Sequence, residues 1–137
     1  MSVLEIHNET RRVLPSRSVF VKIANEVLPG WEISLVFVGS AKAKKLNEKL
    51  RDKNYIPNVL SYEVGEKSGE IIICPAEADK QAPSYDLSSK DFTIFLFIHG
   101  LLHIKGWAHG ATMEKWEQKL LARYAPSNHG AKNSHRH

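Results

Sequence analysis

Residues 91–109 read Asp-Phe-Thr-Ile-Phe-Leu-Phe-Ile-His-Gly-Leu-Leu-His-Ile-Lys-Gly-Trp-Ala-His. The first part of this stretch is apolar almost without interruption, which predicts a helix that is buried nearly all round. His99 and His103 are four residues apart, so on a helix their rings stack on one face. Gly106 suits the left-handed residue that ends a helix, and a turn there can bring His109 back to the other two imidazoles.

Three converging imidazoles with one open position form the ligand set of a catalytic zinc site. A single His in an apolar helix is more often a hydrogen-bonded core residue than a metal ligand. The i, i+4 pair and the third His after a glycine argue against that simpler interpretation, because buried imidazoles need hydrogen bonds or a metal. We therefore predict that His99, His103 and His109 bind one Zn²⁺ per chain.

The composition of the 137-residue chain, 42% hydrophobic and 25% charged, is ordinary for a soluble globular protein, and we expect one domain over residues 1–125. The apolar stretch 92–104 is too short for a membrane span and contains two His. We expect no signal peptide, and the single cysteine, Cys74, fits a packing role in a reducing cytoplasm. A net charge of +4 permits an anionic partner without identifying one. The polar tail 126–137 is predicted to be disordered.

The remaining hydrophobic patterns predict four strands and further helices. The last two strands flank a turn at residues 65–69 and are predicted to pair as a hairpin. Ser40 is predicted to cap a helix whose outer faces carry a cluster of basic side chains, which alone most often marks a solvated surface. The predicted strands span residues 3–8, 31–38, 58–64 and 70–74, and the other helices begin near residues 16, 41 and 112.

Two families share the histidine spacing. The metzincin proteases carry His-Glu-x-x-His-x-x-Gly-x-x-His, but Gly100 stands where their catalytic glutamate would be. The stretch also resembles the signature His-Gly-x-Leu-His-Leu-x-Gly-Tyr-Asp-His of the YbeY family of bacterial rRNA maturation endoribonucleases. It departs from that signature at Trp107, which is conservative, and at Ala108, which replaces an Asp. The matching positions are His99, Gly100, Leu102, His103, Gly106 and His109.

Blocks upstream of the histidines favour the YbeY family, because no metzincin has them. The family's pattern Ser-x-x-x-x-x-Leu-Asn-x-x-x-Arg is similar to residues 40–51. Its Thr-Asp/Asn-Val-Leu-Ser-Phe block is similar to residues 57–62, with Pro57 in place of Thr. Residues 68–71 resemble the family's Leu-Gly-Asp-Ile. The resemblance covers about residues 36–121, with the blocks in the same order.

The resemblance implies an α+β fold, in which a small mixed four-stranded sheet packs with about five helices and zinc lies in a cleft. It implies a cytoplasmic, single-strand-specific endoribonuclease that acts in small-subunit rRNA 3′-end maturation and ribosome quality control. Ribosomal subunits and assembly factors would be partners. Arg51 matches the family arginine considered to act on the scissile phosphate, and we expect it to be catalytic together with His99. The residues expected to hold RNA are Lys42, Lys45, Lys49, Arg51 and Asn58.

Ala108 leaves the function open between three classes. An Asp at this position would orient a ligand or the substrate, and its loss weakens such a site unless another carboxylate, for which Glu114 is a candidate, replaces it. The classes are a metal-dependent RNase, a metzincin-like peptidase, and a ribosome-associated RNA-binding protein with weak or lost catalysis. Gly100 argues against the peptidase, and Ala108 keeps the binding protein open.

If the three histidines are the ligands, purified protein should carry about one zinc per chain and H103A should lose it. Metal analysis of both proteins checks this, with deletion of residues 127–137 as the control for the tail histidines. Full zinc content in the triple alanine variant, together with loss on deleting the tail, would contradict the assignment.

Overall fold

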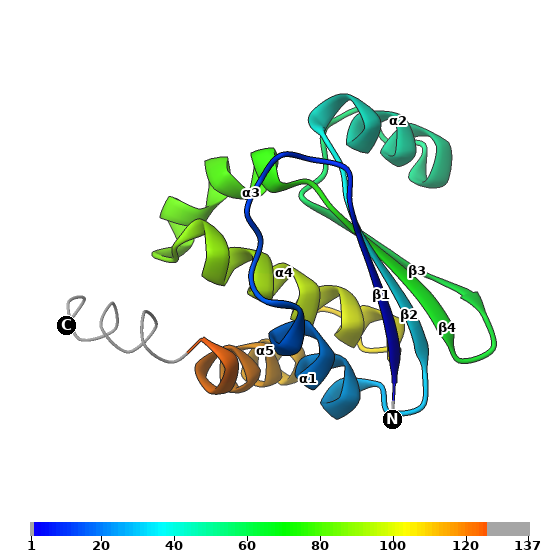
Figure 1. Cartoon of the computed structure of the whole chain (residues 1–137), viewed down its shortest axis with the longest axis vertical. Coiled ribbons are helices and arrows are strands. Elements are labelled where there is room, and N and C mark those ends of the chain that lie inside the picture. The colour runs from blue at the N-terminus through cyan, green and yellow to red at the C-terminus, as the bar shows by residue number, and fades with distance from the viewer. Residues whose placement is uncertain (1, 126–137) are drawn as a thin grey trace.

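The computed structural model describes residues 2–125, so the tail for which we predict disorder lies outside the described residues. Four strands form one mixed sheet and five α-helices pack around it, which confirms the predicted α+β fold (Figure 1). The prediction of one domain over residues 1–125 stays a prediction. In chain order the elements are β1 (Val3–Asn8), α1 (Arg17–Val27), β2 (Glu32–Phe37), α2 (Ser40–Arg51), β3 (Val59–Gly65), β4 (Ser68–Ile73), α3 (Pro75–Gln81), the 3₁₀ turn η1 (Ala82–Tyr85), α4 (Ser89–Ile104) and α5 (Ala111–Tyr124).

The sheet has the strand order β1-β2-β4-β3. The neighbouring pairs β1–β2 and β2–β4 are parallel, whereas β3 and β4 pair antiparallel as the predicted hairpin. Alternate residues of β2 reach opposite faces, because successive side chains of a strand point to opposite sides. Leu35 and Phe37 belong to the main core, and Val36 packs in a smaller cluster on the other face.

Helix α4 fills the main core. Eleven of its sixteen residues are buried, as the apolar run predicted. It lies between the sheet and the pair of helices α1 and α5 (Figure 1). The rings of Phe97 in α4 and Phe20 in α1 meet edge to face with centroids 5.0 Å apart. Ser88 is the N-cap of the helix, and its hydroxyl accepts a hydrogen bond of 3.1 Å from the backbone N–H of Asp91.

Helix α2 covers one end of the opposite face of the sheet (Figure 1). It begins at Ser40 itself with Gly39 as N-cap, so the prediction that Ser40 caps the helix was wrong. The Ser40 hydroxyl instead lies 3.8 Å from the thiol of Cys74, which is buried in the small cluster beneath α2. Among the described residues, no helix is long and apolar enough to cross a membrane.

Gly100 lets the backbone of α4 rest directly on the sheet. A Cβ atom at this position would lie 3.2 Å from Cδ1 and 3.3 Å from Cγ2 of Ile71, closer than side chains normally approach. Since Ile71 is itself fully buried in β4, it has little room to move away. The position that carries the catalytic glutamate in metzincins therefore has no space for one here.

G100E should lower the free energy of unfolding by at least about 3 kcal/mol, because it overpacks the helix–sheet contact and buries a carboxylate. Urea denaturation checks this. K90E, at an exposed position in the first turn of the same helix, is the matched control and should change stability by less than about 0.5 kcal/mol. A folded G100E protein as stable as the parent would contradict the close packing.

Candidate metal centre and adjoining cleft

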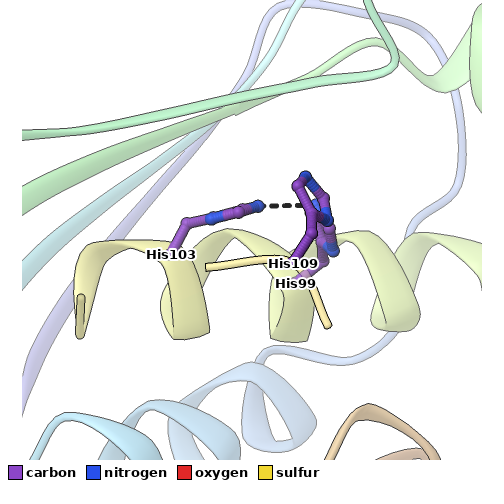
Figure 2. Close-up of side chains that lie close together, drawn as sticks. All are labelled: His99, His103 and His109. Carbon is purple, nitrogen blue, oxygen red and sulfur yellow. Dashed lines mark hydrogen bonds between the residues drawn. The ribbon is translucent and has the colours of Figure 1, made fainter. Parts of the chain in front are cut away.

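The rings of His99, His103 and His109 converge at the surface of α4 (Figure 2). The Nε2 atoms of His99 and His103 are 3.1 Å apart, as residues one helical turn apart allow. The ring centroid of His109 lies 5.2 Å from that of His99 and 4.6 Å from that of His103. One nitrogen from each ring lies within 4.8 Å of the others, so the three can hold a metal ion together.

The loop after α4 brings His109 back to the helix. Gly106 adopts a φ of +105°, a left-handed conformation that favours glycine, as the sequence predicted. The backbone N–H groups of Gly106 and Trp107 then donate to the carbonyls of His103 and Leu102 at 3.0 and 3.1 Å. The indole of Trp107 also packs edge to face on Trp116 of α5, with centroids 6.1 Å apart. These contacts hold the short loop that carries the third imidazole.

Two of the histidines are oriented through their second ring nitrogen. His99 Nδ1 contacts a carboxylate oxygen of Glu117, and His103 Nδ1 donates to the carbonyl oxygen of Trp107 at 3.1 Å. Both acceptors require an N–H on Nδ1, so the neutral rings present lone pairs on Nε2. At a separation of 3.1 Å the two Nε2 atoms can share a proton in a hydrogen bond or bind one cation together. The donor set therefore fits a bound cation.

Electrostatics favour a neutral imidazole at His103. Burial lowers the pKa of His103, and the neighbouring His99 and His109 lower it further, because a charge on either ring would repel a second charge. Neutral imidazole is the form that binds a metal. A set of three nitrogen donors suits zinc or another transition metal better than magnesium or calcium, which prefer oxygen ligands.

Glu117 is a site residue that the sequence analysis missed. It is only 6% exposed and lies on the inward face of α5. Glu114, the candidate suggested to replace the Asp missing at position 108, is exposed instead, one turn earlier on the helix. The spacing of residues in the sequence could have indicated Glu117, because it shares its helical face with Met113, Leu120 and Leu121. A carboxylate among core residues needs a partner.

A cleft of about 640 Å³ opens beside the histidines. Arg51 at the end of α2 lines it together with the three imidazoles, although Arg51 and His99 are far apart in the sequence. The Arg51 guanidinium donates a long hydrogen bond of 3.4 Å to the hydroxyl of Tyr55. Asn58 also lines the cleft, and its amide donates to Gln81 at 2.7 Å. The structure thus brings Arg51 and Asn58 to the predicted metal ligands.

The three lysines predicted to hold RNA lie elsewhere on α2. Lys42, Lys45 and Lys49 are all exposed, and none of them lines the cleft. The ammonium of Lys42 lies 2.8 Å from a carboxylate oxygen of Glu9, and this hydrogen bond lowers the pKa of Glu9. Lys42 is therefore already paired within the protein, and Lys45 and Lys49 are exposed on the same helix.

Comparisons with known proteins show to which protein family the chain belongs. The family model described as Endoribonuclease YbeY matches residues 2–125. A Mesoplasma florum protein named Endoribonuclease YbeY is 30% identical over 132 residues, covering 88% of this chain and 75% of the relative. A Thermodesulfovibrio yellowstonii protein of the same name is 36% identical over 107 residues, covering 69% of this chain and 67% of the relative.

The fold has a solved counterpart. The solution structure of TM1509 from Thermotoga maritima superposes with a TM-score of 0.65 at 19% identity, covering 98% of this chain and 94% of that one. At this identity the likeness concerns the fold alone. The family model and the two relatives show that the chain belongs to the Endoribonuclease YbeY family.

E117Q should weaken zinc binding by about 10- to 100-fold while the protein stays folded, because an amide supports the His99 imidazole less well than a carboxylate does. Competition with a chromophoric chelator measures the affinity. E114Q, which changes an exposed carboxylate on the same helix, is the matched control and should bind zinc like the parent. Equal affinity in E117Q and the parent would show that the Glu117 contact does not support the metal.

Proposed function

We propose that this protein is a zinc-dependent endoribonuclease that cleaves single-stranded RNA in the cleft between α2 and α4. The observation that carries the proposal is the placement of Arg51 in one cleft with three converging imidazoles. Relatives at 30% and 36% identity are named endoribonucleases, which supports an RNA-cleaving hydrolase.

Arg51 is proposed to bind the scissile phosphate. Its guanidinium is exposed in the cleft and offers a planar set of donors to two phosphate oxygens. It stays protonated throughout the reaction, so it stabilises the extra negative charge that develops on the phosphorus oxygens. The Tyr55 hydroxyl at 3.4 Å is close enough to limit the directions in which the side chain extends.

His99, His103 and His109 are proposed to hold the zinc. Zinc, when bound, supplies a Lewis acid for oxygen atoms at the reacting phosphate. His99 contributes to catalysis as a ligand, because Glu117 occupies its Nδ1 and leaves no free nitrogen to transfer a proton. Asn58, beside the histidines in the cleft, is proposed to contact the RNA next to the phosphate.

The proposed substrate is rRNA of the small ribosomal subunit, cleaved in 3′-end maturation and ribosome quality control in the cytoplasm. The support is the resemblance in the sequence blocks around Arg51, Asn58 and the histidines, together with the net charge of +4, which suits a polyanion. Lys45 and Lys49 are proposed to hold the RNA backbone as it leaves the cleft. The ribosome and its assembly factors are the proposed partners.

A second candidate is an RNA-binding protein with weak or lost catalysis. The observation that favours it is the metal loop: His109 is exposed and follows Ala108, where the family signature has an Asp. A less firmly held third ligand weakens a metal site. The peptidase interpretation has no such support, because Gly100 leaves no room for a glutamate base.

R51A should reduce the rate of RNA cleavage by about 100-fold or more while zinc stays bound, since charge stabilisation of this kind commonly supplies about 3 kcal/mol. K45A and K49A should weaken RNA binding only modestly and reduce its salt dependence, because each phosphate contact releases about one counterion. K42A, whose ammonium is paired with Glu9, is the matched control on the same helix.

The assay compares single-stranded RNA, duplex RNA and casein, each with and without a chelator. Cleavage of single-stranded RNA alone, abolished by the chelator, is the expected result. Zinc-loaded protein that binds RNA but never cleaves it would contradict the nuclease and support the binding protein. Cleavage of casein would contradict both RNA functions.

A further inference from the structure

A second hollow of about 330 Å³ adjoins the cleft. It shares Asn58, Val59, His99 and His109 with the cleft, so the two open onto the same histidines. Its other walls come from η1, α4 and α5, and include Tyr85, Phe95, Met113 and Glu114. The proposed reaction has no role for these side chains.

Aromatic rings lead from the solvent to the candidate metal centre along this hollow. Tyr85 is 51% exposed. Its centroid lies 4.7 Å from that of Phe92 and 5.9 Å from that of Phe95. Phe95 in turn stacks on His99, with centroids 6.2 Å apart and planes 30° from parallel. Tyr85 is therefore held in place by packing while part of its ring stays open to a ligand.

The charges of the hollow differ from those of the cleft. The hollow has two carboxylates, Glu114 and Glu117, and among the residues that the structure describes no lysine or arginine lines it, whereas Arg51 lines the cleft. A phosphate is favoured beside Arg51 and repelled by the two carboxylates. An aromatic wall with a carboxylate acceptor at its rim suits a flat, uncharged group with N–H donors, and in RNA that group is a nucleobase.

We propose that this hollow is a nucleobase subsite, in which Tyr85 and Phe95 stack one unpaired base next to the scissile phosphate. Glu114 accepts a hydrogen bond from an N–H group of that base. The inference rests on the proposed RNA cleavage and adds a source of its strand preference. A base within a duplex is already stacked and paired and cannot enter the hollow, whereas a base of a single strand can.

The test measures binding of oligonucleotides to the zinc-loaded protein by fluorescence anisotropy. The probes are cleavage-resistant 2′-O-methyl RNA strands of about eight nucleotides, each with one base replaced by an abasic residue. The parent protein should bind one of these strands about 5- to 150-fold more weakly than the intact strand, and the missing base of that strand marks the position that enters the hollow. Y85A should lose a similar factor with the intact strand and become indifferent to the abasic residue at that position.

Y85F is the matched variant, because it keeps the stacking ring and removes only the hydroxyl, and it should behave like the parent. Val64, which is 57% exposed on β3 and outside the hollow, gives a second control as V64A. With 2-aminopurine at the position that enters the hollow, binding should quench the fluorescence in the parent and Y85F but not in Y85A. Zinc content and thermal unfolding confirm that each variant is folded.

Two results would overturn the subsite: Y85A binding all the strands as the parent does, or losing affinity equally for intact and abasic strands. If the parent still cleaves single-stranded RNA and R51A does not, the nuclease proposal stands and only the subsite falls. If the parent neither binds nor cleaves single-stranded RNA, the nuclease proposal falls and the subsite falls with it.

Discussion

The direct packing of α4 on the sheet at Gly100 is the constraint on which the site depends. With no side chain at this position, the helix backbone packs so near Ile71 of β4 that a Cβ atom would lie only 3.2 Å from its side chain. The helix is buried on nearly every other side, so its position and rotation are set by the core. His99 and His103 are half-buried at the one part of its surface that faces the cleft. A polar site thus rests on a helix that the core holds in place.

The three imidazoles are held with different degrees of support. His99 and His103 come from the buried helix, and each has its second nitrogen engaged, by Glu117 and by the Trp107 carbonyl. His109 comes from the following loop and is exposed. Because the third ligand comes from a loop, the packing of Trp107 on Trp116, which holds that loop, also supports the site.

The surroundings of the histidines divide by charge. Arg51 faces the shared histidines from the cleft, and Glu114 and Glu117 face them from the hollow. Because a nucleotide is itself divided into an anionic phosphate and an uncharged base, such a site can orient a strand by its chemistry. Asn58, which lines both spaces, lies where the phosphate and base of one nucleotide would meet.

Prediction from sequence succeeded where the information was local. The apolar run in α4, the hairpin of β3 and β4, and the turn at Gly106 all depend on neighbouring residues, and all three are confirmed. The Ser40 cap was wrong by one residue, because Ser and Gly both suit a helix start and the choice depended on how α2 packs over Cys74. The predicted contact of the α2 lysines with RNA stays a prediction, and the sequence pattern did not indicate that Lys42 pairs with Glu9, 33 residues earlier.

The sequence by itself determined that His99 and His103 are four residues apart and would share one face of a helix. It also determined that a third histidine, His109, follows shortly after them. The shared face follows because helix geometry depends only on separation along the chain. Only the tertiary structure decided which distant groups meet those imidazoles: Glu117 eighteen residues after His99, Arg51 from α2, and Tyr85 beside Phe95. Such contacts depend on how buried faces pack against each other, and no local pattern of residues encodes that.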